Sequence, residues 1–315
     1  MGNLAVSLAF VFPGQGSQSP GMLHRLGDHP AIARTLDEIS EALGADIREF
    51  DSAERLQSDV AVQISLLSAG VATAQALSEQ DIKPAAVSGL SVGAFAAAVI
   101  AGVLSLRDAV HIVKLRAEEM MKLYPEGYGL SAIVGLSEAQ VASMVRAVYS
   151  DRNPVFVGNI NAPQQIVIAG SNAAMEQVLA EARRRGARKT VRLNVSIPSH
   201  CPLLQPVAHI LGKELGKVHL SQPRSVYVGN ISARAMRAKE AIAFDLANNI
   251  AHGVRWHDAT TVLAELGCQV FLEMPPGHVL SDLARENLSD VKSLPLETGP
   301  TAKVLDSARR EQGRT

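Results

Sequence analysis

The chain has 315 residues, of which 47% are hydrophobic and 19% are charged, and its formal net charge is −1. This length and composition allow one large domain, or two unequal ones, with a sizeable buried core. Because there is no basic excess, the sequence lacks the electrostatic footprint of a protein that binds nucleic acid or an anionic membrane surface.

The sequence also gives no indication of a membrane or secreted protein. The longest apolar stretch, around residues 95–104, is far shorter than the roughly 18 residues of a membrane span. The N-terminus has no basic region or small-residue cleavage site, and Val6 stands where a myristoylation signal has Ser or Thr. The two cysteines, Cys201 and Cys268, are too few for a disulfide framework or a cysteine zinc cluster. We therefore expect a cytoplasmic protein with no metal centre.

The N-terminal part is predicted to alternate strands and helices. Residues 4–12 are rich in β-branched and aromatic side chains and stop at the loop PGQGSQSPGM, which is typical of a buried strand. Three helices and a strand are expected to follow: a helix over 60–80, a strand over 85–89, an alanine-rich helix after Ser91, and a helix over 105–124 whose Ser105 and Asp108 resemble a capping box.

From residue 129 the expected order of elements is βαββαβ, the order of a ferredoxin-like unit, in about 65 residues. A small domain is therefore predicted to be inserted into a larger α/β domain. Its elements are strands over 130–136, 155–161, 164–170 and 187–195 and helices over 137–150 and 171–186; beyond it, strands are expected near 225–229 and 269–272 and helices over 240–251 and 257–266.

Ser91 is the first candidate for chemistry, because it lies in GLSVG between a predicted strand and a predicted helix. Gly-x-Ser-x-Gly in that setting is the pattern of a nucleophile elbow: the glycines allow a sharp turn, and the serine is exposed at a helix N-terminus. The free N–H groups there favour a developing oxyanion. The alternative is a plain strand–helix turn that needs a small residue. Catalysis also requires a base and an oxyanion hole.

Of the nine histidines, His200 is the best candidate for a general base. The segment NVSIPSHC places it directly after a strand and between two prolines, and loops at strand ends carry the chemistry of α/β sheets. His278, after the turn PPG, is a weaker competitor, and the other histidines are expected at surface or helix positions. Cys201 could be a thiol nucleophile, but no turn in the sequence is built to present it.

Four segments, FVFPGQGSQ, GLSVG, LR at 115–116 and PSHCPLL, occur in an order that resembles the malonyl-CoA:acyl-carrier-protein transacylase family. The resemblance covers roughly residues 8–290. It implies an α/β-hydrolase-like domain that carries an inserted ferredoxin-like subdomain. The boundaries expected on this basis are 1–128 and 197–296 for the discontinuous catalytic domain, 129–196 for the subdomain, and 297–315 for a polar tail.

The resemblance also implies roles for residues of the reaction centre. Ser91 matches the family nucleophile and His200 its base, which in the family is oriented by a main-chain carbonyl, here that of Asn249. Gln15 and Val92 match the residues whose backbone N–H groups form the oxyanion hole. The glycines beside Gln15 allow its backbone such a close approach.

Arg116 matches the family arginine that binds the free carboxylate of malonate. Without the resemblance, an ordinary helix arginine paired with Glu119 would be the simpler interpretation. A bidentate arginine–carboxylate pair has a geometry that lysine cannot copy. Asn159 and Asn161 match a family stretch that lines the acyl site.

The elbow departs from the usual family sequence Gly-His-Ser-Leu-Gly-Glu at three positions: Leu90, Val92 and Ala94. The segment GLSVGAFAAA is most similar to the transacylase (epsilon) subunit of malonate decarboxylase. That similarity implies, as partners, malonyl-CoA, a dedicated carrier subunit with a phosphoribosyl-dephospho-CoA prosthetic thiol, and other decarboxylase subunits. No bound cofactor is expected, because coenzyme A enters as the substrate thioester and the carrier thiol is the acceptor.

Three alternatives remain open at this point: a malonyl transacylase of fatty-acid synthesis, a thioester hydrolase on the same fold, and a non-catalytic scaffold subunit. A hydrolase has no use for a buried Arg116, and an idle scaffold would not need Ser91 and His200. The arginines at 183–185 and 188 could meet an acidic carrier, although solvation of a helix face explains them equally well.

Overall fold

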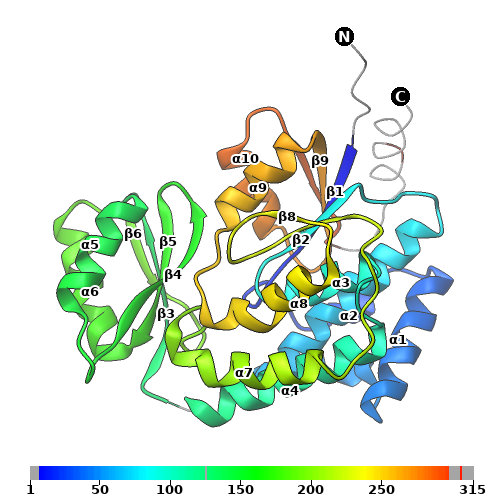
Figure 1. The fold of residues 1–315 in the computed structure, drawn as a ribbon, viewed down its shortest axis with the longest axis horizontal. Helices are drawn as coiled ribbons and strands as arrows, with labels where there is room; N and C mark the ends of the chain where they lie inside the picture. Colours follow the sequence, from blue (N-terminus) through cyan, green and yellow to red (C-terminus); the bar gives the residue numbers. More distant parts are fainter. Residues whose placement is uncertain (1–6, 125, 298–305, 307–315) are drawn as a thin grey trace.

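The structure is a computed structural model that describes residues 7–124 and 126–297 together with Asp306. Two separate β-sheets organise the chain, a six-stranded sheet in the larger part and a four-stranded sheet in a lobe beside it (Figure 1). Residues 4–6 of the first predicted strand, and almost all of the predicted polar tail over 297–315, lie outside the described residues.

The six-stranded sheet has the strand order β10-β9-β1-β2-β7-β8. Its strands pair in parallel, except that β8 runs antiparallel to β7. The carboxyl ends of β1, β2 and β7 therefore meet at one edge, where open α/β sheets carry their sites. The strands are β1 Ser7–Phe12, β2 Ala86–Gly89, β7 Val226–Val228, β8 Ala235–Met236, β9 Cys268–Glu273 and β10 Lys292–Pro295.

Helices cover both faces of this sheet (Figure 1), which explains the continuous apolar run of β1. Leu8, Phe10 and Phe12 pack into the cluster that holds α1–α4, α7 and α8. Ala9 and Val11 point to the opposite face, against α9 and α10. The helices are α1 Pro30–Leu43, α2 Asp59–Ser78, α3 Gly93–Ile100, α4 Leu106–Leu123, α7 Gln205–Leu215, α8 Lys239–Asn248, α9 Trp256–Glu265 and α10 Val279–Asn287.

Helix α2 is long and mostly buried, with contacts to α1, α3 and α4. It is long and apolar enough to cross a membrane by length and composition, but 89% of that apolar window is buried inside the fold. The prediction from residues 95–104 underestimated the apolar stretch, because Ser, Thr and Gln residues interrupt α2 in the sequence. Burial on all sides identifies α2 as the core helix of the α1–α4 layer.

The four-stranded sheet belongs to the ferredoxin-like subdomain, whose strand order is β4-β5-β3-β6 with antiparallel pairing throughout. One face packs on α5 and α6 through side chains such as Ile133, Ile166 and Ile168. The alternate residues Leu130, Ala132 and Val167 point to the other face. The elements are β3 Tyr128–Val134, α5 Glu138–Val148, β4 Val155–Ala162, β5 Gln165–Ser171, α6 Asn172–Arg184 and β6 Lys189–Arg192.

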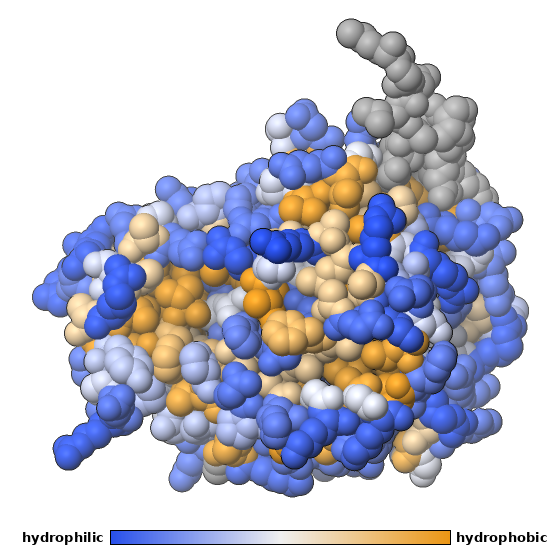
Figure 2. All heavy atoms as spheres, in the orientation of Figure 1, coloured by the Kyte–Doolittle hydropathy of each residue, from blue (hydrophilic) through white to orange (hydrophobic). Residues whose placement is uncertain are grey.

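The basic run on α6 and the turn after it is exposed and paired. Arg184 and Arg185 both pair with Glu181 one turn earlier, and Arg188 lies 3.9 Å from Glu286. These pairs favour a solvated face over a free cationic patch. In the orientation of Figure 1, hydrophilic residues cover most of the margin of the molecule, and apolar residues are interspersed across the middle (Figure 2).

Candidate active site

Ser91 lies at the turn between β2 and α3, and its φ is +56°, in the left-handed region that serine rarely adopts. The two glycines of GLSVG are required by close approach. A Cβ at Gly89 would lie 2.1 Å from the carbonyl carbon and oxygen of Gly93, and a Cβ at Gly93 would lie 2.3 Å from the carbonyl oxygen of Phe12. The sharp turn therefore has the geometry of a nucleophile elbow.

Because backbone atoms enclose Gly93, we expect Gly93→Ala to displace the elbow. The variant should lose about 1–3 kcal/mol of unfolding free energy from overpacking and about 100-fold in acylation of Ser91 from misplacement. Thermal melts and single-turnover acylation measure the two effects. Gly212→Ala in α7, where the nearest atom to the new Cβ is 3.8 Å away, is the matched control. Wild-type stability and rate in Gly93→Ala would contradict the packing argument.

The ring of His200 faces Ser91 in the orientation that a general base would need. Its Nε2 lies 2.7 Å from Ser91 Oγ, and its Nδ1 lies 2.7 Å from the carbonyl oxygen of Asn249. Since a carbonyl oxygen only accepts, Nδ1 carries the proton and Nε2 is left to accept the proton of the serine hydroxyl. The backbone N–H of His200 donates to the carbonyl of Ile250 at 2.7 Å, which fixes the ring to the same segment.

The helix predicted over 240–251 is wrong in its last three residues. Helix α8 ends at Asn248, and the chain continues as a short 3-10 turn, η5 (Asn249–Ala251). This change of winding leaves the Asn249 carbonyl free of the α-helical hydrogen-bond ladder, so that it can accept from His200. Helical periodicity in the sequence does not distinguish the two windings.

Burial lowers the pKa of His200 from 6.5 to about 4; the Asn249 carbonyl opposes that shift in part, and the charge of Arg116 adds to it. A base with a lowered pKa stays neutral, and therefore competent, as the pH falls below 6.5. We expect kcat/KM for the acyl donor to stay flat from pH 7 to about 5 and to fall about tenfold per pH unit below about 4. A pH–rate profile measures this, and an acid limb centred at 6.5 would contradict the assignment.

Arg116 lies on α4 with 1% of its surface exposed. One terminal nitrogen donates to Gln63 Oε1 at 2.5 Å and the other to Ser91 Oγ at 3.0 Å, while its buried Nε has no hydrogen-bond partner among the described residues. The pair with Glu119, which would make Arg116 an ordinary helix arginine, does not form; Glu119 binds Lys122 instead. Burial lowers the pKa of Arg116 only to about 10, so the group stays cationic at neutral pH. Among the described residues it forms no salt bridge, although the charge of Asp59 acts on it, and it lies beside the candidate nucleophile.

The loop after β1 passes directly over the elbow. A Cβ at Gly14 would lie 2.7 Å from the carbonyl oxygen of Leu90, and the N–H of Leu90 donates to the carbonyl of Phe12 at 2.9 Å. Within the described ranges, the N–H groups of Gln15 and Val92 donate to no other protein atom. The Gln15 side chain donates to Asp59 at the start of α2. This side-chain contact holds Gln15 so that its backbone lies beside the elbow.

These groups share a cavity of about 470 Å³ between the two sheets. The open face of the ferredoxin-like sheet forms one wall through Leu130, Ala132 and Val167, and the loop at 14–18 forms another. Asn159 and Asn161 on β4 also line it, and in the part of the chain that the structure describes no donor reaches the buried side-chain oxygen of either. Six of the eight predicted site residues thus line this cavity. The other two, Asn249 and Val92, are next to lining residues: Asn249 bonds to His200, and Val92 follows Ser91.

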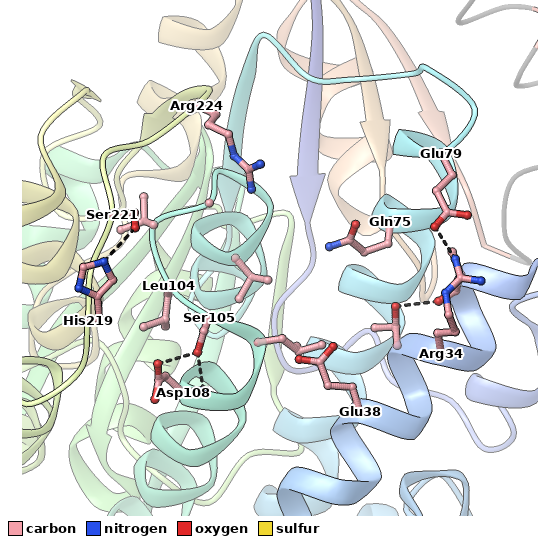
Figure 3. A pocket seen from close by; sticks show the side chains of 16 residues that line it. Arg34, Glu38, Gln75, Glu79, Leu104, Ser105, Asp108, His219, Ser221 and Arg224 are labelled. Carbon is pink, nitrogen blue, oxygen red and sulfur yellow. Dashed lines mark hydrogen bonds and ion pairs between the residues drawn. The ribbon is translucent and has the colours of Figure 1, made fainter.

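A second cavity, of about 590 Å³, contains none of the predicted site residues. Figure 3 shows it between α1, α2, the start of α4 and the segment before β7, with Arg34 and Glu79 paired across one side. His219 and Ser221 lie at its other side, 3.4 Å apart. Within the described ranges, no further side chain hydrogen-bonds to either of them, so this cavity is a weaker candidate for catalysis.

The competing nucleophile and base are placed elsewhere. Cys201 is buried, its thiol donates to the carbonyl of Pro198, and burial raises its pKa to about 12. A thiol with so high a pKa is a poor nucleophile at neutral pH. His278 is exposed and pairs with Asp282 at 2.7 Å on α10. In the described part of the chain, no cluster of three His, Cys, Asp or Glu residues could hold a metal ion.

Sequence reasoning missed three side chains that hold the site together: Gln63, Asp59 and Asn230. Gln63 is fully buried in α2, and a large amide side chain within a predominantly apolar helical segment is the signal that could have identified it. Asn230 follows β7 at the carboxyl edge of the sheet and bonds to the elbow. The sequence shows that Asn230 follows a predicted strand, but it does not show that the side chain bonds to the elbow.

Comparison with known proteins decides the family. Residues 9–315 match the acyl transferase domain family. The chain belongs to this family. The acyltransferase is 37% identical over 283 residues to a malonyl CoA-acyl carrier protein transacylase of Salmonella typhimurium, an alignment that covers 88% of this chain and 91% of that protein.

Solved structures agree with the acyltransferase along nearly its whole length. The malonyl CoA-acyl carrier protein transacylase of Coxiella burnetii superposes with a TM-score of 0.92 at 32% identity, covering 98% of each chain. A malonyl-transacylase in complex with a type II PKS acyl-carrier protein superposes with a TM-score of 0.91 at 32% identity, covering 96% of this chain and 99% of that one. The fold expectation, an α/β-hydrolase-like sheet with a ferredoxin-like insertion, is confirmed.

Proposed function

We propose that this acyltransferase moves a malonyl group from malonyl-CoA to the prosthetic thiol of an acyl carrier protein, through an ester on Ser91. The observation that carries the proposal is the single cavity in which Ser91 Oγ contacts both the base His200 and the buried cation Arg116. The relatives named as malonyl CoA-acyl carrier protein transacylases support the donor and the acceptor.

The acylation step begins at Ser91 Oγ, which attacks the thioester carbonyl carbon while its proton passes to Nε2 of His200. The N–H groups of Gln15 and Val92 donate to the resulting oxyanion. When the C–S bond breaks, the His200 proton goes to the departing thiolate, and free coenzyme A leaves. The carrier thiol then attacks the Ser91 ester, with His200 accepting its proton, and the same steps run in reverse.

Arg116 selects the acyl group in this proposal. In malonyl-CoA a single methylene separates the carboxylate from the thioester carbonyl, so a carboxylate on Arg116 would place that carbonyl at Ser91, 3.0 Å from the guanidinium. The carboxylate would take over the hydrogen bond now made to Ser91 Oγ and could also reach the unpartnered Nε. Asn159 and Asn161 are proposed to line the acyl site from the facing sheet.

The comparisons favour the general malonyl transacylase, of the kind used in fatty-acid synthesis, over a malonate decarboxylase subunit, because the named relatives are transacylases that serve acyl carrier proteins. The decarboxylase carrier stays a hypothesis that rests on the elbow segment GLSVGAFAAA, with its departures at Leu90, Val92 and Ala94. We further propose that the catalytic domain comprises 1–128 and 197–296, that the subdomain comprises 129–196, and that the protein acts in the cytoplasm.

Carrier choice and reaction type are tested in one assay. Malonyl-CoA is incubated with the enzyme and with either a phosphopantetheine carrier or a phosphoribosyl-dephospho-CoA carrier, and malonyl-carrier and free malonate are measured by mass spectrometry. Transfer to the first carrier at a much higher rate supports the general transacylase, and preference for the second supports the decarboxylase subunit. Malonate release without transfer to either would identify a thioester hydrolase and contradict the proposal.

A further inference from the structure

One buried side chain with no role in the steps above bonds to the elbow at two points. Asn230, two residues after the end of β7, is 1% exposed. Its Oδ1 accepts from the N–H of Ser91 at 2.9 Å, and its Nδ2 donates to the carbonyl oxygen of Gly89 at 2.8 Å. A single amide therefore joins the two residues on either side of Leu90, where the chain turns from strand to helix.

Asn230 is itself held on its backbone by a buried carboxylate. The N–H of Asn230 is shared between the two oxygens of Asp245, at 2.9 and 3.1 Å. The N–H of Ile231 and the hydroxyl of Tyr227 donate to the same carboxylate, at 3.0 and 3.1 Å. Asp245 is 1% exposed, so these bonds are sheltered from water.

A second backbone group of Asn230, its carbonyl, ties it to the segment that joins the two sheets. The N–H of Arg255 donates to the carbonyl oxygen of Asn230 at 2.9 Å. The preceding residue, Val254, pairs with the ferredoxin-like subdomain: its N–H donates to Gly158 and its carbonyl accepts from Ile160, both at 2.8 Å. Asn230 thus connects the elbow to a rigid frame made of β7, α8 and the subdomain junction.

Two features of the elbow need such support. Ser91 has a positive φ, a conformation that persists in a non-glycine residue only where the surroundings hold it. The elbow also presents two adjacent N–H groups, of Ser91 and Val92, at the start of α3. Because Asn230 accepts from Ser91, that N–H is occupied, and the N–H of Val92 is the one left for an oxyanion.

We propose that Asn230 is the positioning residue that holds Ser91 in its reactive conformation and assigns the oxyanion contact to Val92, with Asp245 holding Asn230 in place. The inference rests on the proposed function for its substrate, malonyl-CoA. It concerns the elbow geometry, however, and that geometry can be probed with any reagent that acylates or phosphonylates the serine.

The test uses the full chain with three substitutions. Asn230→Leu removes both elbow bonds at similar volume, and Asp245→Asn weakens the hold on Asn230 while keeping its shape. Ser88→Ala is the matched control, because Ser88 is equally buried on the strand before the elbow and its hydroxyl donates to the carbonyl of Val228, away from Ser91. Single-turnover acylation by malonyl-CoA is followed at several concentrations, with rates normalised to the folded fraction measured by near-ultraviolet circular dichroism.

For Asn230→Leu we expect the maximal acylation rate to fall about 100-fold while the half-saturating malonyl-CoA concentration changes by less than about threefold. Asp245→Asn should lose about tenfold and Ser88→Ala less than about threefold. The acid limb of the pH profile should stay where it is in the wild type, since Asn230 makes no contact with His200 or Asn249.

A merely structural role gives a different result: a lower melting temperature with a wild-type rate per folded molecule, which would overturn the proposal. If Asn230→Leu does not fold, the acylation rate of Asp245→Asn tests the proposal instead. A wild-type rate in Asp245→Asn would also overturn it. If malonyl-CoA leaves the wild type unmodified, the proposed function fails instead. A fluorophosphonate then replaces malonyl-CoA as the probe. Slower labelling of Ser91 in Asn230→Leu than in the wild type supports the positioning role, whereas equal labelling in the two proteins overturns that role.

Discussion

Replacement of His200 by alanine is expected to reduce malonyl transfer by about 10⁴-fold or more, because the base and the nucleophile act as one unit. In the proposed mechanism, His200 accepts the Ser91 proton across 2.7 Å and returns it to the leaving thiolate. Steady-state transfer to a carrier protein measures the effect, with the folded state checked by thermal melting. His209→Ala, an exposed histidine on α7, is the control and should keep full activity.

The residual activity of His200→Ala should also depend on pH in a different way from the wild type. With the base absent, the rate should rise about tenfold per pH unit as hydroxide or serine alkoxide replaces it, instead of staying flat above about pH 5. Activity within about tenfold of the wild type would show that another group deprotonates Ser91. The arrangement around Asn249 would then be only structural.

Replacement of Arg116 is expected to change selectivity more than any other substitution in the cavity. A charge-assisted pair with the malonyl carboxylate contributes about 1.5–3 kcal/mol, which corresponds to about one to two decades of preference for malonyl-CoA over acetyl-CoA. Arg116→Ala should therefore lower kcat/KM for malonyl-CoA by at least about tenfold to 100-fold and leave acetyl-CoA nearly unchanged. The ratio of the two kcat/KM values is the measurement.

Two companion variants sharpen the result for Arg116. Arg116→Lys keeps the charge but not the two-nitrogen fork, and should recover only part of the preference. Arg107→Ala removes an exposed arginine from the same helix and should leave the ratio unchanged. Since the Arg116 charge helps to lower the pKa of His200, the acid limb of Arg116→Ala should move to higher pH. An unchanged malonyl-to-acetyl ratio would contradict the role of Arg116.

Local sequence patterns predicted the elements that carry a strong period or turn signal. The strand before GLSVG, the helix from Leu106, and the βαββαβ order of the subdomain are all found in the structure. Helices α1, α7 and α10 and strands β8 and β10 were not predicted. The two strands are short and lie at the edges of the sheet. Pro206 at the start of α7 resembles a loop residue in the sequence, although proline is favoured in a first helical turn.

The site residues that lie in sequence motifs could be predicted. Ser91 and His200 lie in turns whose glycines and prolines are visible in the sequence, and the resemblance supplied Gln15, Val92, Arg116 and Asn249. The supporting contacts were not predictable, because they join positions far apart in the chain. Asn230 reaches across to Ser91, 139 residues earlier, and Gln63 reaches Arg116, 53 residues later. Only the packed sheet and helices bring such pairs together.

The central claim is that Ser91 forms a malonyl ester, and the most direct test is the mass of the intact protein after brief incubation with malonyl-CoA. Wild type and Ser91→Ala are compared, with acetyl-CoA in parallel. We expect one malonyl adduct on the wild type, a weak acetyl adduct, and neither adduct on Ser91→Ala. An unmodified wild type with malonyl-CoA unconsumed, or an equal adduct on Ser91→Ala, would contradict the account.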